Sequence, residues 1–251
     1  MNDSQPWRVL ELNGGRVEWG DSGFFLLPPV AAGYADAQLD DYGQAGGRFA
    51  WRPGATLSLS ARFSHDAEWL RGTAGFGFWN APFGDPSRRR PARPQAAWFF
   101  FASASSDLPF APGEPGRGWF AGTIDAATRA AAALIPAAPG VLLLNQFAAA
   151  RRRVWPAVRR RLGIHAAPVL AEMTAWHDYR LEWRPEGARF LVDGTTILET
   201  PQAPRGPLGF VCWLDNQCLL LTPRGRFRAG VLQTHVAQWM EIDGLTLVQD
   251  N

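Results

Sequence analysis

The stretch that decides the fold lies between Trp176 and Glu199 and reads WHDYRLEWRPEGARFLVDGTTILE. In its first half, Tyr179, Leu181 and Trp183 alternate with charged side chains, which is the period of a strand with one buried face. In its second half, Asp193-Gly194 separates two apolar runs, which is the turn signal of a β-hairpin. The stretch therefore predicts a half-buried strand followed by a hairpin.

Further strand patterns lie on both sides of this stretch. Thr56–Phe63 alternates apolar and polar residues, and Ala96–Ala104 (AAWFFFASA) is a short apolar run typical of a buried strand. Between them, Gly72–Asn80 contains glycines that allow close approach of neighbouring backbones. GPLGFVCWLDNQCLLLTP and the terminal WMEIDGLTLVQD supply the last apolar runs. The chain has 26 Gly and 20 Pro among 251 residues, which indicates many turns between short strands. The pattern predicts an all-β sandwich that forms one domain over residues 1–251.

Composition excludes several other classes of protein. A hydrophobic content of 47% is far too high for a disordered chain. A net charge of +2, with every basic residue an arginine, gives no basis for nucleic-acid binding. The N-terminal MNDSQPWRVLELNGG lacks the pattern of a secretory signal, and no apolar run is long enough to span a membrane. The sequence thus predicts a cytoplasmic protein.

Residues 123–172 interrupt the strand pattern. The segment is rich in Ala, Leu and Arg, so it predicts a helical insertion cut into short pieces by its prolines. Two basic triplets, Arg151–Arg153 and Arg159–Arg161, flank Trp155, and the apolar Val141–Leu144 and Phe147 precede them. Three interpretations stay open: a solvated face, a lid over a groove, or a contact with a membrane surface or anionic partner.

Three of these motifs together resemble the concanavalin A-like jelly roll, and within it the laminarinase-type glycoside hydrolases of family 16. Trp176–Trp183 followed by Val192-Asp193-Gly194 is similar to a strand and hairpin of that family. Gly75–Trp79 is similar to the apolar strand that precedes its catalytic strand, and Glu241–Leu247 is similar to its closing strand. The resemblance implies a jelly-roll β-sandwich with the helical insertion at 123–172 and a carbohydrate ligand.

The chemistry of this family does not follow from the resemblance. Retaining hydrolysis needs two carboxylates about 5–5.5 Å apart, and the family supplies them from one strand with the pattern Glu-x-Asp-x-x-Glu. The matching strand here is Ala96–Ala104, yet no Asp or Glu occurs between Pro86 and Ser106. Bulky rings stand where carboxylates are required. The sequence therefore predicts a ligand-binding jelly roll without the family's glycosidase chemistry, and the catalytic residues of any other reaction stay unassigned.

Candidate ligand-binding residues come from the aromatic runs and from WLDNQ at 213–217. Aromatic side chains on the concave face of a jelly roll can stack on flat apolar ligand surfaces. Asp, Asn and Gln inside apolar sequence form either a tight turn or a polar clamp beside a Trp platform. The predicted ligand-binding residues are Trp79, Asn80, Trp98, Phe100, Trp213, Asp215, Asn216 and Gln217.

Two alternative functions use the same features. The groove would serve an isomerase, a cyclase or an atypical hydrolase acting on a hydrophobic molecule, with Asp215 or Asp107 as the base. The Arg-rich insertion would serve a peripheral membrane or interaction module. No His or Cys spacing predicts a metal site and no cofactor is expected, while a structural calcium ion stays open.

Overall fold

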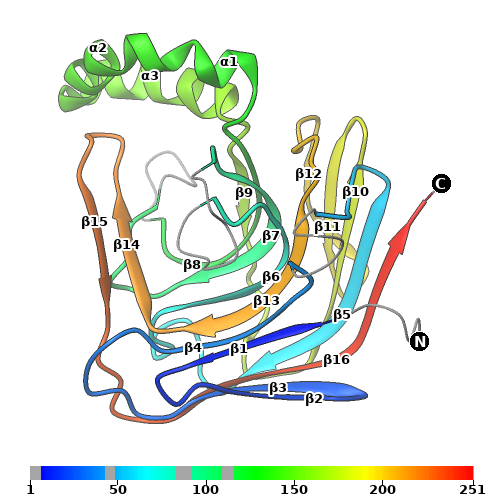
Figure 1. Cartoon of the computed structure of the whole chain (residues 1–251). Coiled ribbons are helices and arrows are strands. Elements are labelled where there is room, and N and C mark those ends of the chain that lie inside the picture. The colour runs from blue at the N-terminus through cyan, green and yellow to red at the C-terminus, as the bar shows by residue number, and fades with distance from the viewer. Residues whose placement is uncertain (1–6, 43–48, 83–91, 109–115, 251) are drawn as a thin grey trace.

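The computed structural model describes residues 7–42, 49–82, 92–108 and 116–250, and its main body is two antiparallel sheets packed face to face (Figure 1). Within these residues each sheet has seven strands. Sheet A has the order β1 (Arg8–Leu12), β4 (Asp36–Asp40), β13 (Gly209–Asp215), β6 (Thr73–Trp79), β7 (Gln95–Ala102), β8 (Gly118–Asp125), β9 (His165–Pro168). Sheet B has the order β12 (Thr195–Thr200), β11 (Gly187–Val192), β10 (His177–Arg184), β5 (Ala55–Phe63), β16 (Gln238–Gln249), β3 (Ser22–Leu27), β2 (Arg16–Trp19). The predicted all-β sandwich is confirmed.

The stretch that predicted the fold forms the β10–β11–β12 edge of sheet B. Tyr179, Leu181 and Trp183 of β10 are buried while their neighbours in sequence are not, as the alternation predicts. Asp193 and Gly194 both have positive φ, of 50° and 73°, and they form the predicted turn between β11 and β12. Strand β5 alternates without a break over Ala55–Phe63, so it presents one face to the core.

The core lies between the two sheets and is rich in aromatic rings. Sheet A contributes Phe76, Phe99 and Phe101, and sheet B contributes Tyr179 and Phe190. Phe99 touches both Tyr179 and Phe190 edge-on, with ring centroids 5.0 and 5.4 Å apart. Burial of these apolar side chains, at about 25 cal/mol per Å² of apolar surface removed from water, supplies the main stabilisation of the sandwich.

The helical insertion is shorter than the predicted 123–172. Helices α1 (Arg129–Ala132), α2 (Leu134–Gln146) and α3 (Ala148–Arg161) occupy its middle, whereas β8 continues to Asp125 and β9 begins at His165. Pairing with β7 draws 123–125 into sheet A, a tertiary effect that Ala-rich composition does not reveal. The prediction that prolines divide the helices is wrong. Pro139 and Pro156 lie inside α2 and α3, and the breaks between helices fall at Ala133 and Phe147.

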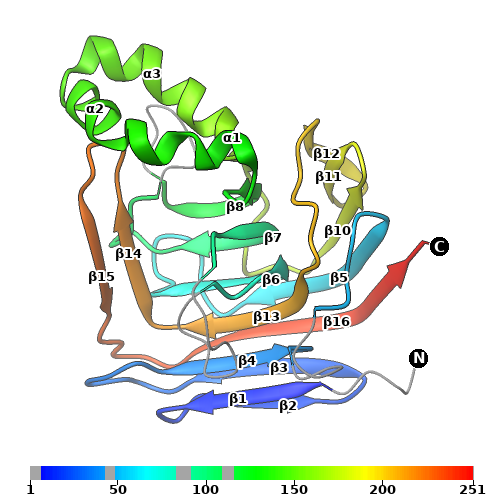
Figure 2. The same ribbon diagram turned by 45° about the horizontal axis from the view of Figure 1, so that its top comes forward.

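The apolar runs around WLDNQ do not form a hairpin with each other. Strand β13 ends at Asp215 in the middle of sheet A, and β14 (Gln217–Leu221) leaves the sheet to pair with β15 (Phe227–Val231). Figure 2 shows this hairpin projecting from the sheet toward the helices. At its tip, Asn145 Nδ2 donates to the carbonyl of Pro223 (2.9 Å) and Gln146 Nε2 donates to that of Arg224 (3.0 Å). The end of α2 is thereby held on the hairpin.

Candidate functional site

A second cluster of aromatic side chains covers the outer face of sheet A, the face turned away from sheet B. Alternation along β7 sends Phe99 and Phe101 into the inter-sheet core and Trp98 and Phe100 to this outer face. Trp79 of β6 and Trp213 of β13 join them from the neighbouring strands. The four rings of Trp79, Trp98, Phe100 and Trp213 are called the aromatic row below.

The rings of the aromatic row contact one another. Trp98 stacks on Trp79 with centroids 4.6 Å apart and on Phe100 at 5.0 Å, and it lies 5.5 Å from Trp213. Trp98, Phe100 and Trp213 are only 7–8% exposed, whereas Trp79 is partly exposed. Trp79 is therefore the end of the row that a ligand reaches most directly.

Two glycines of β6 make room for the row. A Cβ at Gly75 would lie 2.9 Å from Cη2 of Trp213 and 2.2 Å from the carbonyl oxygen of Phe99. A Cβ at Gly77 would lie 2.6 Å from Cβ of Trp98. Large rings on β7 and β13 can thus lie across β6 only because β6 has no side chain at these positions.

The row ends at a hydrogen-bonded polar group. Trp213 Nε1 donates to Thr73 Oγ1 (3.0 Å), and that hydroxyl donates to Asp215 Oδ1 (2.8 Å). The same oxygen accepts from the backbone N–H groups of Thr73 (3.1 Å) and Gln217 (2.9 Å). Burial raises the pKa of Asp215 to about 6, because desolvation outweighs these hydrogen bonds.

Asp36 of β4 is a second buried carboxyl at this end. It lies directly opposite Asp215 in the strand register, on the same face, and is 1% exposed. Its Oδ1 has no hydrogen-bond partner. Burial, followed by the charge of Asp215, raises the pKa of Asp36 well above its ordinary value. Tyr34 adjoins both carboxyls, and burial raises its pKa further above the ordinary range.

Sequence reasoning missed Asp36. In its segment, Asp36, Gln38 and Asp40 alternate with the apolar Ala37 and Leu39. This alternation was the available signal, because it places three polar side chains on one face of a strand. What the sequence could not give is the register that sets Asp36 against Asp215.

Asp40, two residues further along β4, differs from Asp36 and Asp215 because it forms an ion pair with Arg8. Arg8 donates to it through Nη2 (2.7 Å) and Nε (2.9 Å), and Gln38 Nε2 adds a bond of 2.6 Å. These charge-assisted hydrogen bonds hold the Asp40 side chain against Arg8. The ionisable groups of this face thus divide into a paired Asp40 and the coupled acids Asp36 and Asp215.

The remaining predicted residues serve mainly the backbone. Asn216 is fully buried: its Oδ1 accepts from Ala35 N (2.9 Å), and its Nδ2 donates to the carbonyls of Gly33 (3.0 Å) and Leu232 (2.8 Å). Asn80 similarly bonds the carbonyl of Arg93 (2.8 Å) and the N–H of Gln95 (3.0 Å). Gln217 is exposed at the start of β14.

The structure gives less support to glycosidase chemistry, to Asp107 as a base and to a metal site. Strand β7, which the sequence resemblance predicted as the counterpart of a catalytic strand, carries no Asp or Glu. Asp107, the alternative base, is tied at its side chain to the N–H of Gly116 (3.3 Å) and at its backbone to β14. Among the described residues, no group of three or more His, Cys, Asp or Glu side chains is placed to hold a metal ion.

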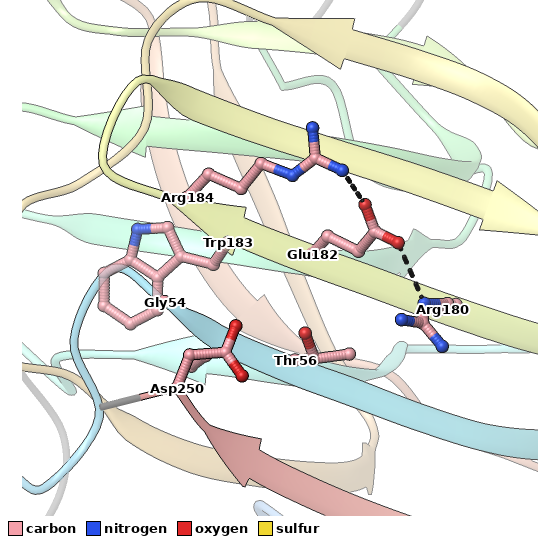
Figure 3. Close-up of a pocket in the computed structure, with 8 residues that line it drawn as sticks. Gly54, Thr56, Arg180, Glu182, Trp183, Arg184 and Asp250 are labelled. Atoms are coloured by element: carbon pink, nitrogen blue, oxygen red, sulfur yellow. Dashed lines mark hydrogen bonds and ion pairs between the residues drawn. The ribbon is translucent and has the colours of Figure 1, made fainter.

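A separate hollow of about 200 Å³ lies on the opposite side of the sandwich, against sheet B (Figure 3). Glu182 stands at its edge between Arg180 and Arg184 and forms ion pairs with both. The indole of Trp183 is buried in the core and donates to the carbonyl of Pro204 (2.8 Å). The charges of Glu182, Arg180 and Arg184 offset one another, and the hollow offers no open aromatic ring.

The chain has the fold of a jelly-roll β-sandwich, and the outer face of sheet A carries a row of aromatic rings. The sequence matches no protein-family model and no curated protein sequence. Among solved structures, the chain is similar to a Crh5 transglycosylase in complex with NAG, with a TM-score of 0.51 and 9% identity over 98% of this chain and 79% of that one. It is also similar to a Bacillus licheniformis β-glucanase, with a TM-score of 0.51 and 8% identity over 100% of this chain and 95% of that one. The predicted jelly roll resembling family 16 is confirmed at the level of the fold.

Proposed function

We propose that the outer face of sheet A binds a ligand with a flat apolar face, and that a sugar residue is the first candidate. The observation that carries this proposal is the continuous row of four rings that ends at a buried polar group. Aromatic rings stack on flat apolar surfaces, and a neighbouring carboxyl accepts hydrogen bonds from hydroxyl or amine groups. The two structural neighbours add support, since one holds NAG and the other is a β-glucanase.

The proposed role is binding without the family's double displacement. That reaction takes its nucleophile and its acid from one strand, and β7 offers only apolar side chains and one glutamine. Trp79 would make the first contact, because it is the partly exposed ring of the row. Trp98, Phe100 and Trp213 would support its orientation from below.

Titration of tryptophan fluorescence with glucan oligosaccharides of several linkages tests this proposal. A saturable change is expected, with affinity about three- to tenfold weaker in Trp79→Ala, since one aromatic stacking contact contributes about 0.5–1.5 kcal/mol. Trp69→Ala is the matched control, because Trp69 is 64% exposed and lies outside the row. If no oligosaccharide changes either the fluorescence or the melting temperature, the sugar proposal fails.

A second candidate is an enzyme that moves a proton on a hydrophobic substrate. The observation that favours it is that Asp36 and Asp215 lie opposite each other and are both buried, and burial raises the pKa of both carboxyls, that of Asp215 to about 6. Asp215 would act as the base and Asp36 as the proton donor. Asp215→Asn should then abolish turnover of a substrate identified by mass spectrometry of co-purified small molecules, while the variant still folds. Full turnover in that variant would exclude this role of Asp215.

A further inference from the structure

Helix α2 presents apolar side chains to solvent rather than to the body of the protein. Ile135 is 66% exposed and Leu143 is 64% exposed, and they are eight residues apart, so they lie on one side of the helix. Phe147, at the junction with α3, is 63% exposed. Several large exposed apolar side chains on one short segment are typical of a surface that binds a partner.

The same insertion carries positive charge alone. Between residues 126 and 171 there are seven arginines and no Asp or Glu. Helix α3 packs against α2 (Figure 2). Its four exposed arginines are Arg152, Arg153, Arg160 and Arg161. The exposed apolar side chains of α2 therefore belong to a helical segment whose own sequence supplies arginines and no acidic residue.

The two helices are attached firmly enough to present this surface as a unit. The hydrogen bonds from Asn145 and Gln146 hold α2 on the tip of the β14–β15 hairpin. Val158 of α3 is buried, and Arg151 Nη1 donates to the carbonyl of Asn145 (2.7 Å), which joins α3 to the end of α2. The two helices therefore carry their exposed apolar and cationic side chains on one connected unit.

We propose that the α2–α3 surface docks on an anionic lipid bilayer, with Ile135, Leu143 and Phe147 entering the headgroup region. Apolar side chains flanked by arginines are the composition of a helix that lies in the plane of such a membrane. None of the described helices is long and apolar enough to cross a bilayer, and α2 has 13 residues.

The composition of this surface favours an anionic membrane over a second copy of the chain or a nucleic acid. A second copy docking through the same surface would bring two sets of arginines together with no acidic partner between them. A nucleic acid would satisfy the arginines but would leave the leucine and phenylalanine side chains without an apolar partner. This inference does not depend on the ligand proposed for the aromatic row, because it uses different elements.

Co-sedimentation of the full chain with vesicles tests the proposal. Binding is expected to equimolar phosphatidylcholine and phosphatidylserine, and little or none to phosphatidylcholine alone, with a fall as salt rises. Arg160→Glu should weaken binding at least about fivefold, since each arginine near an anionic surface contributes about that factor. Arg52→Glu, a reversal at an exposed arginine outside the insertion, should leave binding unchanged.

The apolar contribution needs its own pair of variants. Leu143→Ser/Phe147→Ser should remove the binding that persists at moderate salt, while Trp69→Ser should not, and all four variants should keep the melting temperature because the sites are exposed. The absence of vesicle binding overturns the proposal, as does binding that neither insertion variant weakens. A dimer that dissociates in Leu143→Ser/Phe147→Ser, without vesicle binding, would assign the surface to a second copy.

Discussion

Asp36 and Asp215 face each other from neighbouring strands, and both are buried where the aromatic row ends. Burial, followed by the charge of Asp215, raises the pKa of Asp36 well above its ordinary value. Thr73 and two backbone N–H groups all donate to Asp215, whereas Oδ1 of Asp36 has no partner. These hydrogen bonds favour the ionised form of Asp215, whereas burial and the charge of Asp215 disfavour the ionised form of Asp36.

The stability of the protein should fall as pH rises from about 4 to 7. Burial raises the pKa of Asp215 from 3.8 to about 6, so the native state binds more protons than the unfolded chain within this window. The difference corresponds to about 3 kcal/mol for this group. Asp36 and Asp41 contribute with the same sign. Urea unfolding at several pH values measures the slope.

The variant Asp215→Asn measures how much of this pH dependence comes from Asp215 rather than from Asp36 and Asp41. The amide oxygen can still accept the bonds from Thr73 and Gln217, so the variant should fold and lose part of the pH slope. Equal slopes in the two proteins would contradict the assignment.

Trp98→Ala should cost about 3–5 kcal/mol of unfolding free energy, the usual effect of truncating a buried aromatic side chain. Trp98 is the ring that contacts all three other members of the row, so its loss leaves a cavity between them. Near-ultraviolet circular dichroism should weaken as well. A change below about 1 kcal/mol would mean that the row is not packed as described.

Gly75→Ala should destabilise the protein by about 2–3 kcal/mol, because the new methyl group meets the Phe99 carbonyl oxygen and the Trp213 ring. Thermal unfolding measures the effect. Gly20→Ala is the matched control, since a Cβ there has no heavy atom within 4 Å. Equal effects of the two substitutions would contradict the close approach of β13 and β6.

Asn216→Ala should cost about 3 kcal/mol or more, because it leaves the N–H of Ala35 and two backbone carbonyls without their partner. Gln217→Ala, at the exposed neighbouring position, should change the unfolding free energy by less than about 0.5 kcal/mol. Chemical denaturation distinguishes the two. A large effect at Gln217 and a small one at Asn216 would favour a polar clamp for ligand over a structural tie.

The aromatic members of the candidate site could be named from sequence, because alternation along a strand is a local property. Trp98 and Phe100 share a parity, and so share a face. Which of the two faces is the core was not decidable from AAWFFFASA, since every residue of this run is apolar apart from one serine. Asp36 was missed for a related reason: its partner is 179 positions away along the chain, and only strand pairing brings them together.

The chain's own order of residues determined the local elements: the alternating strands, the Asp193-Gly194 turn and an Ala- and Arg-rich helical segment. These follow from backbone geometry and side-chain periodicity over a few residues. Tertiary structure alone decided the strand order, the limits of the insertion and the meeting of Asp36 with Asp215. The reason is that burial and ionisation are set by neighbours in space, and a jelly roll takes those neighbours from distant parts of the chain.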